Sequence, residues 1–294
     1  DEPVAPPTQK AIFAYGITSG KVSMSNLVNS SGVVASDVTG VGTARDALGG
    51  AEYGIDKAIF AYGDTGSVTN LSNLVSNSGV VASDTTGVGT ARNALEAAGY
   101  GLDKAIFAYG TTGSDSSLSN LVNSSGVIAS DVSGVGTARQ HLAAAGYGTD
   151  KAIFGYGYTS GGSYLSVTNL VTNVGVVGSD VSGVGTGRYG PSAARYGTDK
   201  AIFGYGNNGS NLSMTNLVSN SGVVGSDVSG VGTARYDLAA AEYGGDKAIF
   251  AYGENGSNVS MSNLVNNSGV VASDVSGVGT ARNACAAAGF SSST

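Results

Sequence analysis

Short runs of apolar residues recur along the chain at a spacing of about 47 residues. The most regular run is Lys-Ala-Ile-Phe, followed by Ala or Gly and then Tyr-Gly, and it begins at residues 10, 57, 104, 151, 200 and 247. Six tandem copies of one unit therefore fill residues 10–294. A continuous repeat of this kind predicts one domain, although a chain of 294 residues is long enough for two.

Four segments of the third copy have strand patterns. Lys104–Tyr109 carries apolar residues on both faces, as does a strand that is covered on both sides. Leu118–Val122 and Val127–Asp131 follow turns rich in glycine, serine and asparagine, and Leu142–Tyr147 follows a glycine-rich connector that ends at Arg139. The unit thus predicts an all-β chain, a six-bladed β-propeller with four antiparallel strands in each blade.

The last of these segments also has helix propensity. Residues 91–98, Ala-Arg-Asn-Ala-Leu-Glu-Ala-Ala, would suit a short helix, and the unit would then be a β-solenoid-like or α/β repeat. Other copies place Gly190-Pro191 or Gly49-Gly50 here, which disfavours a helix. Small side chains also suit inner strands that converge on a narrow axis, so we expect a strand.

The ends of the repeat predict how the ring closes. The first copy begins at the Lys10 strand, and the chain finishes with Ala281–Phe290, an inner-strand segment with no further strands after it. This C-terminal strand is expected to complete blade one, which removes both open sheet edges. Residues 1–9, with three prolines, are expected to form an extended N-terminal lead-in.

The order of these signals resembles the kelch repeat: an Arg that ends a connector, a small-residue strand, a strand that ends in aromatic-Gly, and two outer strands. The chain is most similar to glycine- and serine-rich kelch-like proteins of tailed phages, through Thr-Ala-Arg282, Ile-Phe-Ala-Tyr-Gly253 and the terminal Ser291-Ser-Ser-Thr. The pair Tyr109-Gly110 stands where kelch repeats have two glycines, and the outer-strand tryptophan is missing. The resemblance implies a six-bladed propeller closed by its C-terminal strand.

The charge of the chain is regular and acidic. The formal net charge is −7 and the pI is about 4.6, which disfavours nucleic acid or an anionic membrane surface as partner. The sequence contains no run of 18 apolar residues, so membrane insertion is not predicted, and no leader sequence is expected. The neutral, small-residue surface is typical of virion or extracellular proteins.

One aspartate and one arginine recur in every copy. We expect Asp131 with Arg139, and the matching pairs elsewhere, to be partly buried ion pairs that hold the connector, although a ring of ligand-binding charges is the alternative. The twelve residues are Asp37, Arg45, Asp84, Arg92, Asp131, Arg139, Asp180, Arg188, Asp227, Arg235, Asp274 and Arg282.

Few residues suggest chemistry. His141 and Cys285 are the only residues of their types, so neither a two-histidine copper site nor a nucleophile paired with a base is expected. No carboxylate pair stands apart from the repeat, which gives glycoside hydrolysis no support. The sequence predicts a non-enzymatic protein with no metal and no cofactor.

The copies differ most in the loop after the Lys-Ala-Ile-Phe strand and in the two residues after each repeat arginine. In kelch blades these two places share one face, and variation on one rim over a constant frame is typical of binding surfaces. Drift without function is the alternative. The predicted rim contacts are Tyr158, Tyr164, Tyr189, Tyr236, Asn207 and Asn255.

These expectations favour a binding or structural propeller. The sequence predicts a phage virion or fibre-associated protein that contributes to assembly or host-surface attachment, with other virion proteins or a host-surface glycan or protein as partner. The alternative is a secreted, multivalent, lectin-like propeller with similar sites between its blades.

Overall fold

The repeated Lys-Ala-Ile-Phe segment forms the central strand of every sheet. In the computed structural model, which describes residues 9–293, the four residues after each lysine are buried, because neighbouring sheets pack against both faces of the strand. The central strands are β1 (Lys10–Ala14), β4 (Lys57–Ala61), β7 (Lys104–Ala108), β10 (Lys151–Gly155), β13 (Lys200–Asn207) and β16 (Lys247–Ala251).

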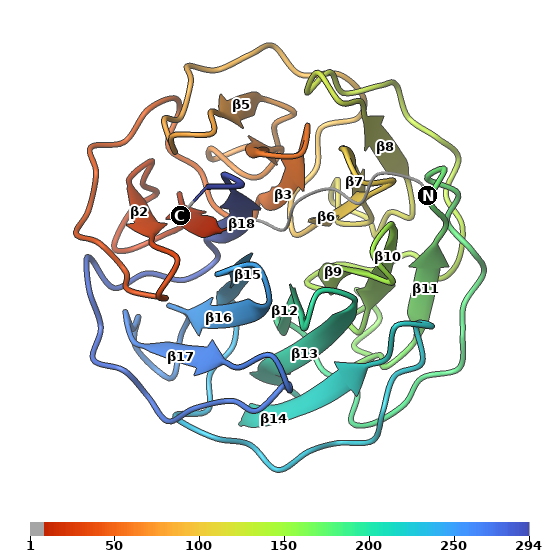
Figure 1. Cartoon of the computed structure of the whole chain (residues 1–294). Helices are drawn as coiled ribbons and strands as arrows, with labels where there is room; N and C mark the ends of the chain where they lie inside the picture. Colours follow the sequence, from red (N-terminus) through yellow and green to blue (C-terminus); the bar gives the residue numbers. More distant parts are fainter. Residues whose placement is uncertain (1–8, 294) are drawn as a thin grey trace, which may run out of the picture.

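Each central strand lies between two antiparallel partners. The inner partners are β18 (Ala286–Phe290), β3 (Gly49–Tyr53), β6 (Glu96–Tyr100), β9 (Ala143–Tyr147), β12 (Ser192–Tyr196) and β15 (Ala239–Tyr243). The outer partners are β2 (Ser25–Val28), β5 (Ser72–Val75), β8 (Ser119–Val122), β11 (Thr168–Val171), β14 (Asn211–Val218) and β17 (Ser262–Val265). Figure 1 shows these sheets as blades around a central axis. The described residues form an all-β, six-bladed propeller, as predicted, and β9 confirms that the alanine-rich segment is a strand.

The C-terminal strand closes the first blade. β18 pairs with β1 in antiparallel register, with Ile12 opposite Ala288 and Lys10 opposite Phe290. β18 also packs between β15 and β3, the inner strands of the two adjacent blades. The first sheet therefore joins the two ends of the repeat, and the closure expected from the sequence is confirmed.

The fourth strand of each blade is less regular than predicted. In the third blade, only two bridges join the outermost segment to β8, between Val122 and Ile128 and between Ser119 and Val132. Between these bridges two residues of β8 face three of the outer segment, so the ladder is interrupted by a bulge. The side-chain amide of Asn120 donates to the carbonyl of Ala129 at 3.0 Å in this gap. A side chain thus replaces part of the expected backbone pairing.

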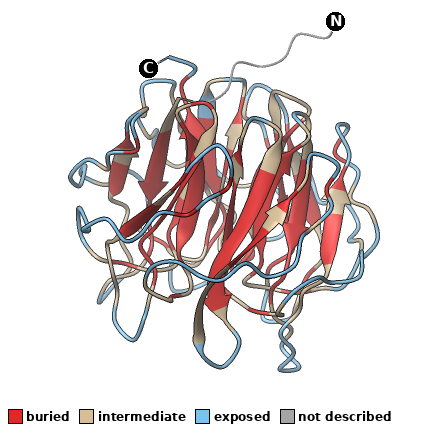
Figure 2. Ribbon diagram, turned by 60° about the horizontal axis from the view of Figure 1, so that its bottom comes forward, coloured by how far each residue is buried: buried red, intermediate tan, exposed pale blue. Residues whose placement is uncertain are grey.

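Aromatic pairs join neighbouring blades all around the ring. The tyrosine that follows each central strand meets the phenylalanine of the next blade, with ring centroids 5.4 Å apart for Tyr62 and Phe107. The last pair, Tyr252 and Phe13, is 5.3 Å apart and spans the closure between the sixth and first blades. Figure 2 shows that the strands are buried and that the loops that connect them are exposed. Each blade interface therefore has its own apolar core.

Candidate functional site

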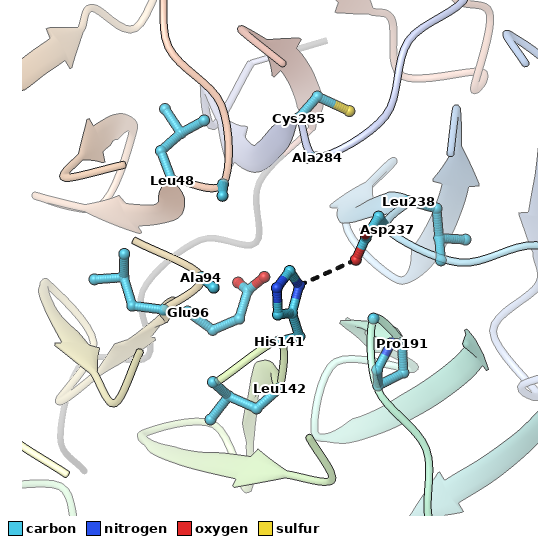
Figure 3. Close-up of a pocket in the computed structure, with 13 residues that line it drawn as sticks. Leu48, Ala94, Glu96, His141, Leu142, Pro191, Asp237, Leu238, Ala284 and Cys285 are labelled. Carbon is cyan, nitrogen blue, oxygen red and sulfur yellow. Dashed lines mark hydrogen bonds and ion pairs between the residues drawn. The ribbon is translucent and has the colours of Figure 1, made fainter. Parts of the chain in front are cut away.

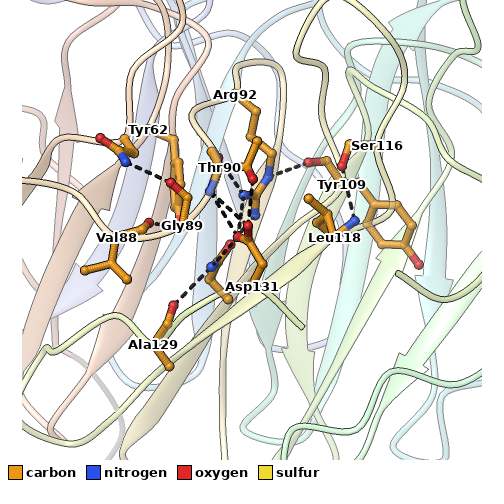
Figure 4. Close-up of polar contacts among 12 residues, drawn as sticks. Tyr62, Val88, Gly89, Thr90, Arg92, Tyr109, Ser116, Leu118, Ala129 and Asp131 are labelled. Carbon is orange, nitrogen blue, oxygen red and sulfur yellow. Dashed lines mark hydrogen bonds and ion pairs between the residues drawn. The ribbon is translucent and has the colours of Figure 1, made fainter. Parts of the chain in front are cut away.

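The six repeat arginines lie inside the blade interfaces and are fully buried. Arg92 donates from Nε to the carbonyl of Tyr109 at 2.9 Å, from Nη1 to the carbonyl of Thr90 at 3.1 Å and from Nη2 to Oδ1 of Asn120 at 2.7 Å. Its guanidinium also lies 4.5 Å from the ring centroid of Tyr62, which belongs to the preceding blade. Figure 4 shows this arrangement. Each arginine therefore joins two blades.

The aspartate partners of these arginines differ from the expected ones. Asp131 lies 4.0 Å from Arg92 rather than beside Arg139, and Asp84 lies 3.7 Å from Arg45. The prediction of pairs within one copy was wrong, because the connector carries each arginine into the next blade, where it meets the aspartate of that blade. The same stagger relates Asp37 to Arg282, Asp180 to Arg139, Asp227 to Arg188 and Asp274 to Arg235.

Hydrogen bonds occupy the repeat carboxylates. Asp131 accepts from the backbone N–H of Thr90 at 3.1 Å, from the Thr90 hydroxyl at 2.6 Å and from the side-chain amide of Asn120 at 2.9 Å. Burial alone would raise the pKa of Asp131, but these hydrogen bonds and the charge of Arg92 together lower it. Because their atoms bond to the scaffold, the repeat Asp/Arg sets offer little to a ligand.

The two variable places of each copy lie on one face of the propeller, as the sequence predicted. Single β-bridges join the residue after each arginine to the first residue of a variable loop, for example Asn93 to Thr111 and Tyr189 to Asn207. We call this the annular face, because the ring of hydrogen bonds described below belongs to it.

Four predicted tyrosines form one cluster on the annular face. Tyr158, Tyr164 and Tyr189 make a triangle with centroid separations of 5.7, 6.1 and 6.0 Å, and the rings of Tyr164 and Tyr189 are nearly parallel. Tyr236 lies edge-on to Tyr189 at 5.3 Å. Tyr189 thus contacts all three other rings. We call Tyr158, Tyr164, Tyr189 and Tyr236 the tyrosine patch.

The two predicted asparagines lie near this patch but differ in their availability. Asn207 uses its side-chain amide to donate to Oδ1 of Asn211 at 2.7 Å, and its Oδ1 accepts from the N–H of Gly209 at 2.7 Å. Asn255 is exposed at a loop tip. Asn207 therefore shapes its own turn, whereas Asn255 is open to solvent.

A ring of backbone hydrogen bonds surrounds the axis at the annular face. This ring was not predicted from the sequence. One residue from each blade donates its N–H to the carbonyl of the corresponding residue in the blade before it, at 2.8 to 2.9 Å. The members are Ala47, Ala94, His141, Gly190, Asp237 and Ala284. All have positive φ, which is 48° at His141. All six residues lie two positions after a repeat arginine, and this shared position is the one feature of the sequence that marks the ring.

Unrepeated polar side chains line a cavity just inside this ring. Nδ1 of His141 lies 3.3 Å from Oδ1 of Asp237, and His141 also meets the ring of Tyr189 at 5.8 Å. Figure 3 shows the carboxyl group of Glu96 pointing toward the imidazole from the side opposite Asp237. Glu96, His141, Asp237 and Cys285 line this cavity, which has a volume of about 40 Å³. The contact of His141 with Tyr189 thus places this cavity next to the tyrosine patch.

The surroundings in the cavity shift the pKa values of these groups. Burial raises the pKa of the Glu96 carboxyl to about 8 and that of the Cys285 thiol to about 11. Burial would lower the pKa of His141, but the charge and hydrogen bond of Asp237 more than offset it, and the pKa is raised. In the described part of the chain, no three His, Cys, Asp or Glu side chains are grouped to hold a metal ion.

Comparisons with known proteins support the fold. No family model matches the chain, and no curated protein matches it either. Among solved structures it is similar to that of YjhT, with a TM-score of 0.62 and 12% identity over 92% of this chain and 98% of the other. YjhT is itself a propeller protein. The chain is therefore a β-propeller with repeated blades. Within residues 9–293, no helix is present that could cross a membrane.

Proposed function

We propose that this chain is a non-enzymatic recognition propeller, associated with a phage virion or fibre, that attaches to a host-surface carbohydrate through the tyrosine patch. The observation that carries the proposal is the contact of Tyr189 with three other tyrosines on the variable face. The virion setting rests on the kelch-like phage resemblance of the sequence.

The chemistry of the patch suits a sugar. A tyrosine ring offers an apolar face to the C–H groups of a pyranose and a hydroxyl to its oxygens. Tyr164 is 40% exposed. Polar groups stand close by, because Tyr236 shares a hydrogen bond with Glu254, whose carboxylate also accepts from Asn283. An aromatic surface bordered by acceptors is the arrangement that sugar hydroxyls can use.

The composition of the tyrosine patch favours one binding site per chain over six equivalent sites. At the place of Tyr158 the other blades have Ile17, Asp64, Thr111, Asn207 and Glu254, and only Tyr236 matches Tyr189 among the residues that follow an arginine. The features that do repeat in every blade, the arginines and aspartates, bond within the scaffold. A multivalent lectin with equivalent pockets, which is the alternative, would need side chains that recur and remain free.

Titration calorimetry with sugars selected on a glycan array tests the proposal. We expect one sugar per chain, and we expect Tyr164→Ala and Tyr189→Ala each to weaken binding about 3- to 10-fold, since an aromatic contact contributes about 0.5–1.5 kcal/mol. Asn93→Ala is the matched control, because Asn93 occupies the place of Tyr189 in another blade. A stoichiometry near six would favour the multivalent lectin, and binding to proteins alone would contradict the carbohydrate proposal.

Co-purification tests the setting separately. Antibodies against the chain should label purified virions or isolated fibres, and the label should survive washing in high salt because the chain has few charges that could hold it nonspecifically. Absence of the chain from virions would exclude the virion role, whatever the calorimetry shows.

A further inference from the structure

The exposed apolar side chains are concentrated on the outer wall of the propeller. Seventeen of the nineteen large apolar side chains that are exposed in residues 9–293 are valines of the six outermost segments, for example Val80 at 65% and Val223 at 66% exposure. The segments span residues 29–43, 76–90, 123–137, 172–186, 219–233 and 266–280. We call these valines the valine belt. Scattered exposed valines are ordinary, but this arrangement recurs in every blade.

The outer segments lack the residues that usually protect a sheet edge. None of the six contains Lys, Arg, Glu or Pro, and each has a single aspartate. That aspartate faces the scaffold, since Asp131 accepts from Thr90 and Asn120. Natural edge strands are commonly blunted by lysine or proline, which discourage pairing with another chain. The wall of this propeller carries neither.

The outer segments also leave backbone groups unpaired. In the third blade, Asn123 donates to the carbonyl of Val127, and Ala129 donates to the carbonyl of Leu121, so both bonds point inward. Between them, the N–H and carbonyl of Ile128 have no hydrogen-bond partner among the described residues. The same two groups are free at Val34, Val81, Val177, Val224 and Val271. Each blade thus offers a donor and an acceptor at its outer edge.

We propose that the valine belt is a lateral contact surface between copies of this chain. A second copy presents the same free donor and acceptor beside the same valines, so two outer segments can pair edge to edge about a two-fold axis. The net charge of −7 does not oppose this contact locally, because the outer segments carry no free charge. A nucleic acid or a strongly charged protein would find no ionic partner on this wall.

Repetition of the edge determines what kind of assembly forms. Six equivalent segments surround the ring, so one copy can contact more than two others, and growth need not stop at a dimer. Each contact is short, because a single residue of each outer segment lies between the two inward-pointing bonds and presents its free N–H and carbonyl there. Association should therefore depend on concentration and produce flat or branched assemblies in which the annular face stays exposed.

Sedimentation velocity on the full chain over a range of concentrations tests the belt. We expect species heavier than the 28.8 kDa monomer whose mass rises with concentration. The triple variant Val33→Lys, Val127→Lys and Val223→Lys should associate more weakly, with a lower mass at each concentration, because three of its six outer edges are altered. The matched control is Ser19→Lys, Ser114→Lys and Ser210→Lys, which adds the same charge at exposed positions of the same three blades on the annular face.

Each outcome decides for or against the belt. A wild-type chain that stays monomeric up to about 1 mM overturns the proposal, and so does association that both triple variants weaken equally. A serine triple at the same three valines removes the apolar surface without adding charge, and it keeps the proposal testable if the lysine variant fails to fold. Weaker association in the serine variant, at an unchanged melting temperature, supports the contact, and association as strong as in wild type overturns it.

Discussion

The backbone N–H of Ala47 donates to the carbonyl of Ala284 at 2.9 Å, and this bond links the second blade to the chain segment that leads into the last strand. Ala284 in turn donates to Asp237 of the sixth blade at 2.8 Å. The propeller is therefore closed twice near its C-terminus, once by the β18–β1 pairing and once by the hydrogen-bonded ring at the axis.

Deletion of residues 281–294 should strongly destabilise the protein. It removes β18, Arg282 and two bonds of the axial ring, and it leaves β1 without its inner neighbour. Deletion of residues 1–8 is the control, since it retains every described strand. Hydrogen exchange should show loss of protection in β1 and β2 only for the C-terminal deletion. Continued protection of these strands would contradict closure of this kind.

Arg139→Ala should lower the free energy of unfolding by about 1–3 kcal/mol, because the carbonyl of Tyr156 and Oδ1 of Asn169 lose a buried donor. Arg139→Lys should rescue little of this loss, since an ammonium cannot reproduce the planar fork or lie flat over the Tyr109 ring. Chemical denaturation measures the effect, with Lys151→Ala as an exposed control. Any carbohydrate binding should persist. An Arg139→Ala variant with normal stability and no binding would show that the arginine contacts ligand.

The double variant Tyr158→Ala and Tyr164→Ala should weaken ligand binding and leave the melting temperature nearly unchanged. Neither residue belongs to a described strand, and their rings contact mainly one another and Tyr189. Thr65→Ala and Thr112→Ala, at exposed positions of loops on the same face, make the control pair. Equal losses in both double variants would mean that the tyrosines have no special role, and the drift interpretation of the rim would then hold.

Stability should fall as the pH rises from about 4.5 to about 8. The pKa of Glu96 is raised from 4.5 to about 8, so the folded state holds a proton there that the unfolded chain has already released. This contribution to the free energy of unfolding is complete below the pKa of Glu96 in the unfolded chain. It is lost as the pH rises through the pKa of Glu96 in the folded protein. Glu96→Gln should flatten this slope and gain stability relative to wild type above pH 8, as measured by thermal melting across the range. Parallel pH profiles for the two proteins would contradict the assignment.

Most of the architecture could be predicted from the repeat. Few closed folds are compatible with a fixed period, central strands that are apolar on both faces, and a last strand that has no partner in its own copy. The repeat did not predict that Asp131 would meet Arg92, since the pairing depends on which blade the connector enters. Nor did it predict the irregular outer segment, where a side chain, Asn120, takes the place of backbone pairing. The convergence of Glu96, His141 and Asp237 was also hidden, because the residues come from three copies and meet only around the axis.

The ring at the axis bears on how such a chain can change over time. The unit is about 47 residues long, so the gain or loss of one copy would add or remove a whole blade. Each unit contributes one donor and one acceptor to a circle whose curvature suits six members. A gene with five or seven copies would encode a circle of different radius, in which every one of these bonds and every Tyr–Phe contact would have to adjust together. A change of copy number would therefore disturb every blade interface at once, whereas a change in one loop disturbs one blade.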